Sequence, residues 1–353
     1  MNAKKILSLA ASTIKFFIIL FIFISNSKAE EANIKYYSND NGILSLMYHR
    51  FNEDKYPSTN IQMEVFKQQI KIIKKLNYNF YDPKELEKNF NKPKLEKKIL
   101  ITIDDAFTSF YEVAWPFLKK EKIPFILFVS TEAVGKNGYM TWKQIKELEK
   151  EDITFIGNHS HTHGYLVDLK DKEFTNDIDT ASSIFNMQLG YNPIFFSYPF
   201  GEYSKFIKDY ISENFQFAFG QHSGVIDINK DRYEIPRFPI NEKYGDLKRF
   251  KFLINLNPLQ YKSLYPIEKY LTNKNNPPKF QVEFFDDQKN INNINCFSDE
   301  GDNWAKSSID LNQNILNLNF RERFNFRRGR INCSLNDNGV WRWFGVQFSI
   351  KQN

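Results

Sequence analysis

The sequence predicts an α/β fold, an irregular (β/α) barrel, followed by a small antiparallel β-sandwich. Before about residue 260, apolar strand-like runs alternate with helix-like runs, which is typical of a parallel sheet with crossover helices. After about residue 275 the helical period gives way to two-residue alternation interrupted by Asn, Asp and Gly, as in short antiparallel strands. Clusters of polar residues follow the predicted strand ends, where a barrel of this kind builds its site. A chain of 353 residues is long enough for two domains.

The N-terminus has the pattern of a secretory signal peptide, residues 1–29. Lys4 and Lys5 precede an apolar run that ends with residues 16–24, and small residues precede a cleavage site after Ala29. Counted from Ile6, the apolar run is long enough to remain as an uncleaved anchor, which is the second interpretation. We therefore expect an exported protein, periplasmic or extracellular, with peripheral or no membrane association.

The charge balance gives no reason to expect a nucleic-acid partner. The chain has 48 basic and 42 acidic residues, and removal of the four lysines of the leader leaves 44 basic residues. Affinity for nucleic acid depends on clustered Lys and Arg facing phosphates. A nearly neutral exported chain is therefore expected to bind neither DNA nor RNA.

Residues 30–265 are predicted to form the barrel. The alternating pattern is clearest between residues 99 and 220. The expected strands are Ile99–Ile103, Phe125–Ser130, Ile153–Gly157, Ile194–Tyr198 and Phe215–Gly220, and the expected helices are Thr108–Lys120, Thr141–Lys150, Lys172–Leu189 and Tyr203–Asn214.

Three of the five histidines fall within five residues, His159, His161 and His163. Imidazoles four residues apart, His159 and His163, can bind one divalent ion, with position 161 directed elsewhere. A His-rich surface tract is the alternative. The cluster by itself is suggestive of a metal site.

A second polar cluster, Asp104 and Asp105, follows the apolar strand Ile99–Ile103. Adjacent carboxylates repel each other unless a cation or a proton lies between them. An aspartate that caps the following helix is the alternative. Together with the histidines, the pair favours a metal bound by Asp105, His159 and His163.

At these residues the chain resembles a known family, the polysaccharide deacetylases with a NodB homology domain (carbohydrate esterase family four). Thr102–Asp105 resembles the family's Thr-Phe-Asp-Asp motif, and His159–His163 its His-Ser/Thr-x-x-His motif. Ser197–Gly201 resembles the third motif, Arg-x-Pro-Tyr-Gly, with Ser197 in place of the arginine. Met47–Arg50 is similar to the subgroup that deacetylates poly-N-acetylglucosamine outside the cytoplasm. The resemblance, over roughly residues 43 to 240, implies a NodB-type barrel that hydrolyses acetyl groups on a polysaccharide.

The charge pattern and the resemblance together assign roles to these residues. A divalent ion, with zinc preferred, is expected to bind Asp105, His159 and His163. Such an ion polarises an acetamide carbonyl and lowers the pKa of a bound water. Asp104, not needed as a ligand, serves as general base, as the first aspartate does in the family. The backbone NH of Phe200, at the family's tyrosine position, is a donor to the oxyanion.

Two histidines are left to protonate the leaving amine. His49, in the Tyr-His element shared with the subgroup, is preferred narrowly over His222, which follows the last strand of the alternating pattern. Arg237, at the end of another strand-like run, is expected to donate a bidentate pair to Asp104 in place of the arginine that Ser197 replaces. A surface arginine is the alternative for Arg237.

Residues 275–353 are predicted to form the sandwich. The only cysteines, Cys296 and Cys333, lie in alternating runs, and an oxidising compartment permits a disulfide between two strands. The aromatic cluster Trp341, Trp343 and Phe344 fits a sandwich core better than a sugar-binding face.

Three functions remain open. The first is metal-dependent removal of N-acetyl groups from an exported or cell-wall polysaccharide. The second is an O-acetyl esterase on a glycan, which the same metal, base and donors would serve. The third is a glycan-binding protein without turnover, although such a site has no use for a base beside the metal.

Overall fold

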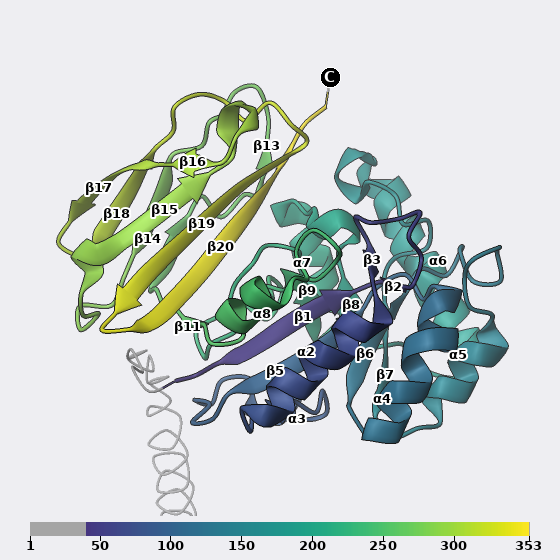
Figure 1. Ribbon diagram of the computed structural model, residues 1–353. Helices are drawn as coiled ribbons and strands as arrows, with labels where there is room; N and C mark the ends of the chain where they lie inside the picture. The colour runs from purple at the N-terminus through teal and green to yellow at the C-terminus, as the bar shows by residue number, and fades with distance from the viewer. Residues whose placement is uncertain (1–39, 353) are drawn as a thin grey trace, which may run out of the picture. The chain divides into compact units, whose positions relative to one another are not determined.

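The computed structural model of the protein describes residues 40–352 (Figure 1). The expected signal peptide, residues 1–29, lies outside the described residues. All described residues belong to one compact unit. Within this part of the chain, no helix has the length and apolarity that a membrane span needs.

An eight-stranded parallel sheet forms the first part of the chain. The strand order is β10-β1-β5-β6-β7-β8-β9, with β4 also paired to β5, and every pairing is parallel. Its strands are β1 (Ile43–Tyr48), β4 (Asn79–Phe80), β5 (Lys98–Ile103), β6 (Phe125–Val129), β7 (Thr154–Asn158), β8 (Phe195–Ser197), β9 (Phe217–Phe219) and β10 (Phe238–Pro239). This is the curled sheet of an irregular barrel, as predicted.

The segment that leads into β10 connects the two edges of this sheet. Ile235 forms a parallel bridge with Phe219 of β9, and Phe238 pairs with Leu46 of β1 three residues later. One short segment therefore spans from the last strand to the first. Arg237 lies within it, between the two pairings.

Alternation along β5 determines which side chains enter the barrel. Ile99, Ile101 and Ile103 pack in the core beneath the helices, whereas Leu100 packs in the core that also holds Phe128 and Phe219. Because side chains on a strand alternate between its faces, Thr102 and Asp104 share the face of Leu100. β5 therefore places the Asp104 side chain at its C-terminal end, on the inner face of the curled sheet.

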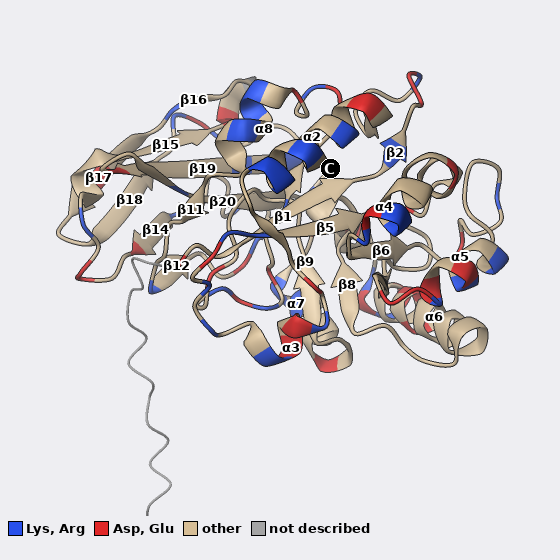
Figure 2. Ribbon diagram, turned by 60° about the horizontal axis from the view of Figure 1, so that its bottom comes forward, with Lys and Arg blue, Asp and Glu red and all other residues tan. Residues whose placement is uncertain are grey.

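Helices follow most of the strands and cover the sheet. They are α2 (Met63–Lys75), α3 (Glu85–Asn89), the π-helical turn η1 (Phe110–Ala114), α4 (Trp115–Glu121), α5 (Trp142–Glu149), α6 (Asp171–Leu189), α7 (Lys205–Asn214) and α8 (Leu247–Leu253). Short 3-10 turns are η2 (Leu166–Asp168), η3 (Pro199–Gly201), η4 (Ile291–Asn293) and η5 (Glu300–Asp302). The sequence places apolar residues of α2 at helical spacing, so that Phe66, Ile70 and Ile73 are buried together. Basic side chains occur on α2 and α8 (Figure 2).

The C-terminal part of the chain forms two facing sheets. The larger has the order β11-β20-β19-β15-β16, with β13 also paired to β20, and the smaller has the order β12-β14-β18-β17. Their strands are β11 (Asn257–Pro258), β12 (Ser263–Tyr265), β13 (Tyr270–Leu271), β14 (Phe280–Glu283), β15 (Ile294–Ser298), β16 (Ala305–Lys306), β17 (Ser308–Asn312), β18 (Ile315–Asn319), β19 (Arg328–Asp337) and β20 (Val340–Ile350). A further small pair is β2 (Arg50–Phe51) with β3 (Asn60–Ile61).

The C-terminal sheets differ from the predicted antiparallel sandwich in one respect. β11 and β13 pair with β20 in parallel, because the segment that leaves α8 runs alongside the last strand before the other strands form. These strands begin before residue 275, the expected start of the second domain. The separation of the chain into domains at residues 265 and 275 stays a prediction.

The predicted disulfide is confirmed. Cys296 of β15 and Cys333 of β19 are directly opposite each other in the antiparallel pair and are bonded. The three aromatic residues Trp341, Trp343 and Phe344 differ in burial. Phe344 is buried in the core of the sheets, whereas Trp343 is partly buried and Trp341 is 38% exposed.

Candidate metal centre and active site

Asp104 and Asp105 follow β5 directly, as the sequence predicts. The Asp104 backbone NH donates to the Tyr48 carbonyl at 2.9 Å, which continues the pairing of β5 with β1 by one residue, and the Asp104 side chain is fully buried. Asp105 then turns into the left-handed region with φ 73°. The two carboxylates therefore point in different directions although their residues are adjacent.

The loop after β7 carries the histidines. The His159 Nδ1 lies 2.7 Å from the Ser197 carbonyl oxygen, and because a carbonyl only accepts, Nδ1–H donates. Burial lowers the pKa of His159 to about 4 despite the neighbouring aspartates, so the ring is neutral at pH 7. Its Nε2 lone pair is consequently available to a metal ion.

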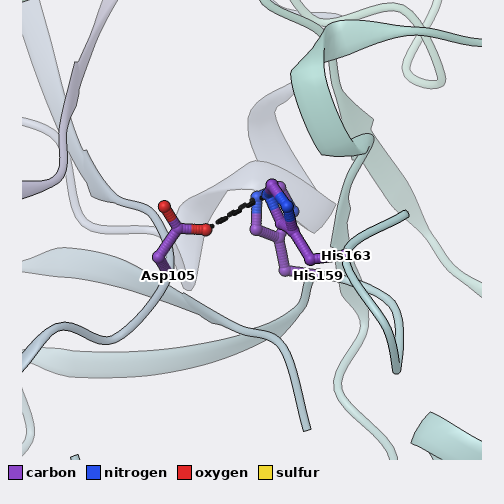
Figure 3. Close-up of side chains that lie close together, drawn as sticks. All are labelled: Asp105, His159 and His163. Carbon is purple, nitrogen blue, oxygen red and sulfur yellow. Dashed lines mark ion pairs between the residues drawn. The ribbon is translucent and has the colours of Figure 1, made fainter. Parts of the chain in front are cut away.

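Three ligand atoms converge at one point (Figure 3). The Asp105 Oδ1 lies 3.2 Å from the His163 Nε2 and 3.6 Å from the His159 Nε2, and all three ligand atoms lie within 4.8 Å of one another. Atoms bound about 2.0–2.1 Å from one ion in tetrahedral geometry stand roughly 3.4 Å apart. The residues present therefore fit a divalent metal ion.

Asp177, which the sequence analysis missed, shapes the histidine loop. From α6 its carboxylate accepts from the His161 NH at 2.8 Å, the Thr162 NH at 3.1 Å and the Thr162 Oγ1 at 2.6 Å. His161 itself points away from the other two histidines, with its Nδ1 2.8 Å from the Thr131 Oγ1. The loop conformation therefore depends on a carboxylate that is not a metal ligand.

Several residues of the site have positive φ, which is uncommon for residues other than glycine. They are Asp105 at 73°, Ser160 at 67°, His163 at 53° and Phe200 at 60°. Ser160 stabilises its own turn, because its Oγ accepts from the His163 NH at 3.0 Å. Such conformations persist where surrounding contacts hold them, and they gather at functional sites.

Arg237 makes the contact with Asp104 that the sequence predicts. Nη1 donates to Oδ1 at 2.6 Å and Nη2 to Oδ2 at 2.9 Å, and both side chains are fully buried. Nη2 also donates to the Ser197 Oγ at 2.8 Å. The guanidinium thus lies against the serine that stands where the family motif has arginine.

The surroundings of Asp104 keep it ionised. Burial acts to raise the pKa of Asp104, but the electrostatic effect of Arg237, followed by smaller effects of His159 and His49, outweighs burial and lowers this pKa to about 2. The His159 Nε2 lies 3.8 Å from the Asp104 Oδ2. A second carboxylate is therefore available, unprotonated, beside the three candidate ligands.

A cavity of about 740 Å³ opens over the site, within the size range of ligand pockets. Asp105, His163, Phe200 and His49 line it, whereas His222 does not. His222 lines two other cavities, and burial lowers its pKa to about 4. The structure thus brings His49 together with the other candidate residues and places His222 apart from them.

The C-terminal sheets contribute to this site, which the sequence analysis did not anticipate. The Gln347 Nε2 of β20 donates to the carbonyl oxygens of Phe200 and Gly201, each at 3.0 Å. The Phe200 ring packs edge-on against His163, with centroids 4.7 Å apart. Gln347 therefore braces the turn that packs the Phe200 ring against a candidate metal ligand.

Residues 91–215 match the family model described as polysaccharide deacetylase. Over these residues the chain carries a polysaccharide deacetylase domain. This match spans the aspartate pair, the histidine loop and the Phe200 turn, so the converging residues lie in the part of the chain that carries the family's sequence.

Curated and solved relatives agree with this assignment. The poly-beta-1,6-N-acetyl-D-glucosamine N-deacetylase of Staphylococcus epidermidis is 24% identical over 245 residues, which cover 61% of this chain and 85% of the relative. The structure of IcaB from Ammonifex degensii is 25% identical, covers 61% of this chain and 97% of that chain, and superposes with a TM-score of 0.53. The deacetylase PplD of Streptococcus pyogenes, 23% identical, covers 61% and 99% with a TM-score of 0.55 and shows the same fold.

Proposed function

We propose that this polysaccharide deacetylase is a metal-dependent enzyme that removes N-acetyl groups from an exported or cell-wall polysaccharide. The observation that carries the proposal is the convergence of Asp105, His159 and His163 beside a separate ionised carboxylate, Asp104. The Staphylococcus epidermidis relative, named as an N-deacetylase of poly-beta-1,6-N-acetyl-D-glucosamine, supports an N-acetylated glycan as substrate. The pattern of residues 1–29 supports export.

Asp105, His159 and His163 would hold a divalent ion, and we infer zinc because nitrogen-rich sites of this kind suit it. When bound, such an ion supplies Lewis-acid chemistry to a carbonyl and makes water more acidic. The Ser197 carbonyl orients the His159 ring for this purpose, since it accepts from Nδ1 and leaves Nε2 free.

Asp104 takes the proton of the attacking water. A general base must be unprotonated and oriented, and the two hydrogen bonds from Arg237 provide both conditions. Arg237 does not touch the reacting atoms in this proposal. It positions Asp104 and keeps it charged.

The oxyanion formed at the acetyl carbon accepts from the Phe200 backbone NH. Phe200 has φ 60°, and Gly201 after it has φ 69°, so the turn departs from the ordinary backbone conformations at two consecutive residues. A side chain at position 201 would also meet the Gln221 backbone nitrogen at 2.6 Å, which explains the glycine there. The turn aims a donor that an extended backbone could not place.

His49 protonates the leaving amine. It follows β1, lines the same cavity as Asp105 and His163, and its charge contributes to the low pKa of Asp104. His222 lines other cavities, so we assign it no part in the reaction.

Acetate release tests the proposal. N-acetylglucosamine oligomers and acetylated xylan are each incubated with wild-type protein, with Asp104→Asn, and with Asp310→Asn, an exposed acid on β17, as the matched control. We expect acetate from the oligomers, abolished by a chelator and restored by zinc, with activity retained in the control and lost in Asp104→Asn. Acetate from xylan alone would indicate an O-acetyl esterase. Binding of oligomers without any acetate would indicate a glycan-binding protein.

A further inference from the structure

A second cavity adjoins the one above the candidate metal centre. It has a volume of about 260 Å³, and four residues line both cavities: Gln221, Pro239, Tyr244 and Arg330. The shared residues come from the loop after β9, from β10 and the loop that follows it, and from β19 of the C-terminal sheets. A chain molecule held at the metal centre can therefore continue into the second cavity without leaving the protein surface.

Several aromatic side chains line this second cavity. Tyr244 and Phe252 come from the last part of the barrel, Trp304 directly precedes β16, and Trp343 lies on β20. Polar groups lie among them, including Ser223, which donates to the Asn332 Oδ1 at 2.7 Å and accepts from the Trp343 Nε1 at 3.1 Å. Aromatic faces with a few polar groups suit a ligand with an apolar face and a polar edge, as a pyranose ring has.

Trp304 has the properties of a stacking platform. It is 43% exposed, so a ligand in the cavity can reach its ring. The Arg330 guanidinium lies 5.4 Å from the Trp304 ring centroid and is itself fixed by Asp299, with the Arg330 Nε 2.7 Å from the Asp299 Oδ2. Because the Arg330 side chain beside it is held in place, the Trp304 ring loses little conformational freedom when a ligand binds.

We propose that this second cavity is a sugar-binding subsite, with Trp304 as its stacking residue, for a distant part of the polysaccharide whose acetamido sugar lies at the metal centre. The proposal rests on the proposed function, and it gives the C-terminal sheets a role: they extend the substrate groove. The occupant is a polymeric glycan because the second cavity continues the catalytic cavity through four common residues. Longer oligomers are therefore better substrates than short ones.

The test is the dependence of kcat/KM on chain length. Acetate release is measured with N-acetylglucosamine oligomers of increasing length, from dimer upward, for wild type, Trp304→Ala and Trp304→Phe. The matched control is Tyr265→Ala, because Tyr265 is 56% exposed on β12 of the smaller C-terminal sheet and lines neither cavity. Thermal unfolding of each variant shows that the sheets remain folded.

We expect kcat/KM of the wild type to rise with length until the second cavity is filled. Trp304→Ala should lose most of that rise, roughly five- to tenfold for the longest oligomer, as expected for loss of one aromatic stacking contact. The dimer should be unaffected, Trp304→Phe should retain most of the rise, and Tyr265→Ala should behave as the wild type. An equal loss at every length, or the same loss in Tyr265→Ala, would overturn the subsite.

Failure of the proposed function is distinguishable from failure of the subsite. If the wild type releases no acetate at any length, calorimetric binding of the same oligomers replaces turnover as the readout. An affinity that rises with length in the wild type and not in Trp304→Ala then supports the subsite although deacetylation has failed. An affinity independent of length, or of Trp304, rejects it.

Discussion

Substitution of Arg237 by methionine tests the buried ion pair between Arg237 and the proposed general base, Asp104. All five N–H donors of the guanidinium have partners. Nε donates to the Gly220 carbonyl at 2.9 Å, Nη1 to Thr102 and Asp104, and Nη2 to Asp104 and Ser197. Arg237→Met keeps much of the side-chain volume and removes all five, leaving the Asp104 carboxylate buried and unpaired.

The expected cost follows from that unpaired charge. Removal of one partner of a buried ion pair destabilises a protein by roughly 3–5 kcal/mol, because the remaining charge loses its counter-ion and cannot reach water. Asp104→Asn leaves the guanidinium without its counter-ion and should cost a similar amount. The double variant buries neither charge, so its cost should fall below the sum of the single costs by at least about 2 kcal/mol.

Urea unfolding of the metal-free proteins at pH 7 measures these free energies. Arg323→Met is the control, since Arg323 is exposed and hydrogen-bonded to Asn273 alone among the described residues, and its cost should stay within about 0.5 kcal/mol. If the free-energy cost of the double variant equals the sum of the two single costs, or if Arg237→Met costs less than about 1 kcal/mol, Arg237 and Asp104 do not form a coupled buried ion pair. In activity, Arg237→Met should also move the acid limb of kcat/KM to higher pH, because burial raises the pKa of Asp104 and the largest opposing effect, that of Arg237, is removed.

Three further predictions concern the histidines and Asp177. His49→Gln should lower kcat for the N-acetylglucosamine dimer by roughly 10²–10⁴-fold, as expected for loss of a general acid. His222 lines the second cavity, so His222→Gln should leave kcat for the dimer unchanged, and the reverse result in steady-state acetate release would exchange the roles of the two histidines. Asp177→Asn should weaken zinc binding roughly 10–100-fold in a competition titration. Asp179→Asn, which changes an exposed acid of the same helix, is the control and should bind zinc as the wild type does. Equal zinc affinities of Asp177→Asn and the wild type would show that Asp177 does not support the histidine loop. Because burial lowers the pKa of His222 to about 4 from 6.5 in the unfolded chain, the unfolded state binds more protons in this window, and stability falls as pH decreases from 6.5 to 4. Between pH 6.5 and pH 5, urea unfolding of the metal-free wild type should therefore lose up to about 2 kcal/mol more than His222→Gln, and parallel losses would contradict this assignment.

The strands of the barrel could be predicted because they are continuous apolar runs that end in polar residues. β5 was expected at Ile99–Ile103 and occupies Lys98–Ile103, and β6 was expected at Phe125–Ser130 and occupies Phe125–Val129. Parallel strands buried on both faces give this signal without alternation. Placement of Asp104 and His159 at one end of the sheet followed from the strand positions alone.

Contacts that depend on distant parts of the chain could not be predicted in the same way. An aspartate within a helix is ordinary, so the sequence gives no sign that Asp177 would accept from the histidine loop. Gln347 is separated from Phe200 by almost the whole C-terminal part of the chain, and a glutamine on a strand has no distinguishing pattern. Positive φ at His163 and Phe200 likewise comes from the surrounding packing, since neither residue favours it.

The C-terminal sheets show a similar division. Two-residue alternation predicts β14, β18 and β19, and the pairing of Cys296 with Cys333 follows from their strands. The strands of two residues, β11 and β13, are too short to show a period, and their parallel pairing with β20 depends on the path of the connecting segment.

Metal content and turnover measured together on single-residue variants separate a metal ligand from a general base. Zinc bound per chain and acetate released from N-acetylglucosamine oligomers are determined for wild type, Asp104→Asn, Asp105→Asn and His163→Gln. We expect one tightly bound ion in wild type and in Asp104→Asn, weak or no binding in the other two, and turnover in the wild type alone. Loss of zinc from Asp104→Asn together with full zinc in Asp105→Asn would contradict the assignment of ligand and base.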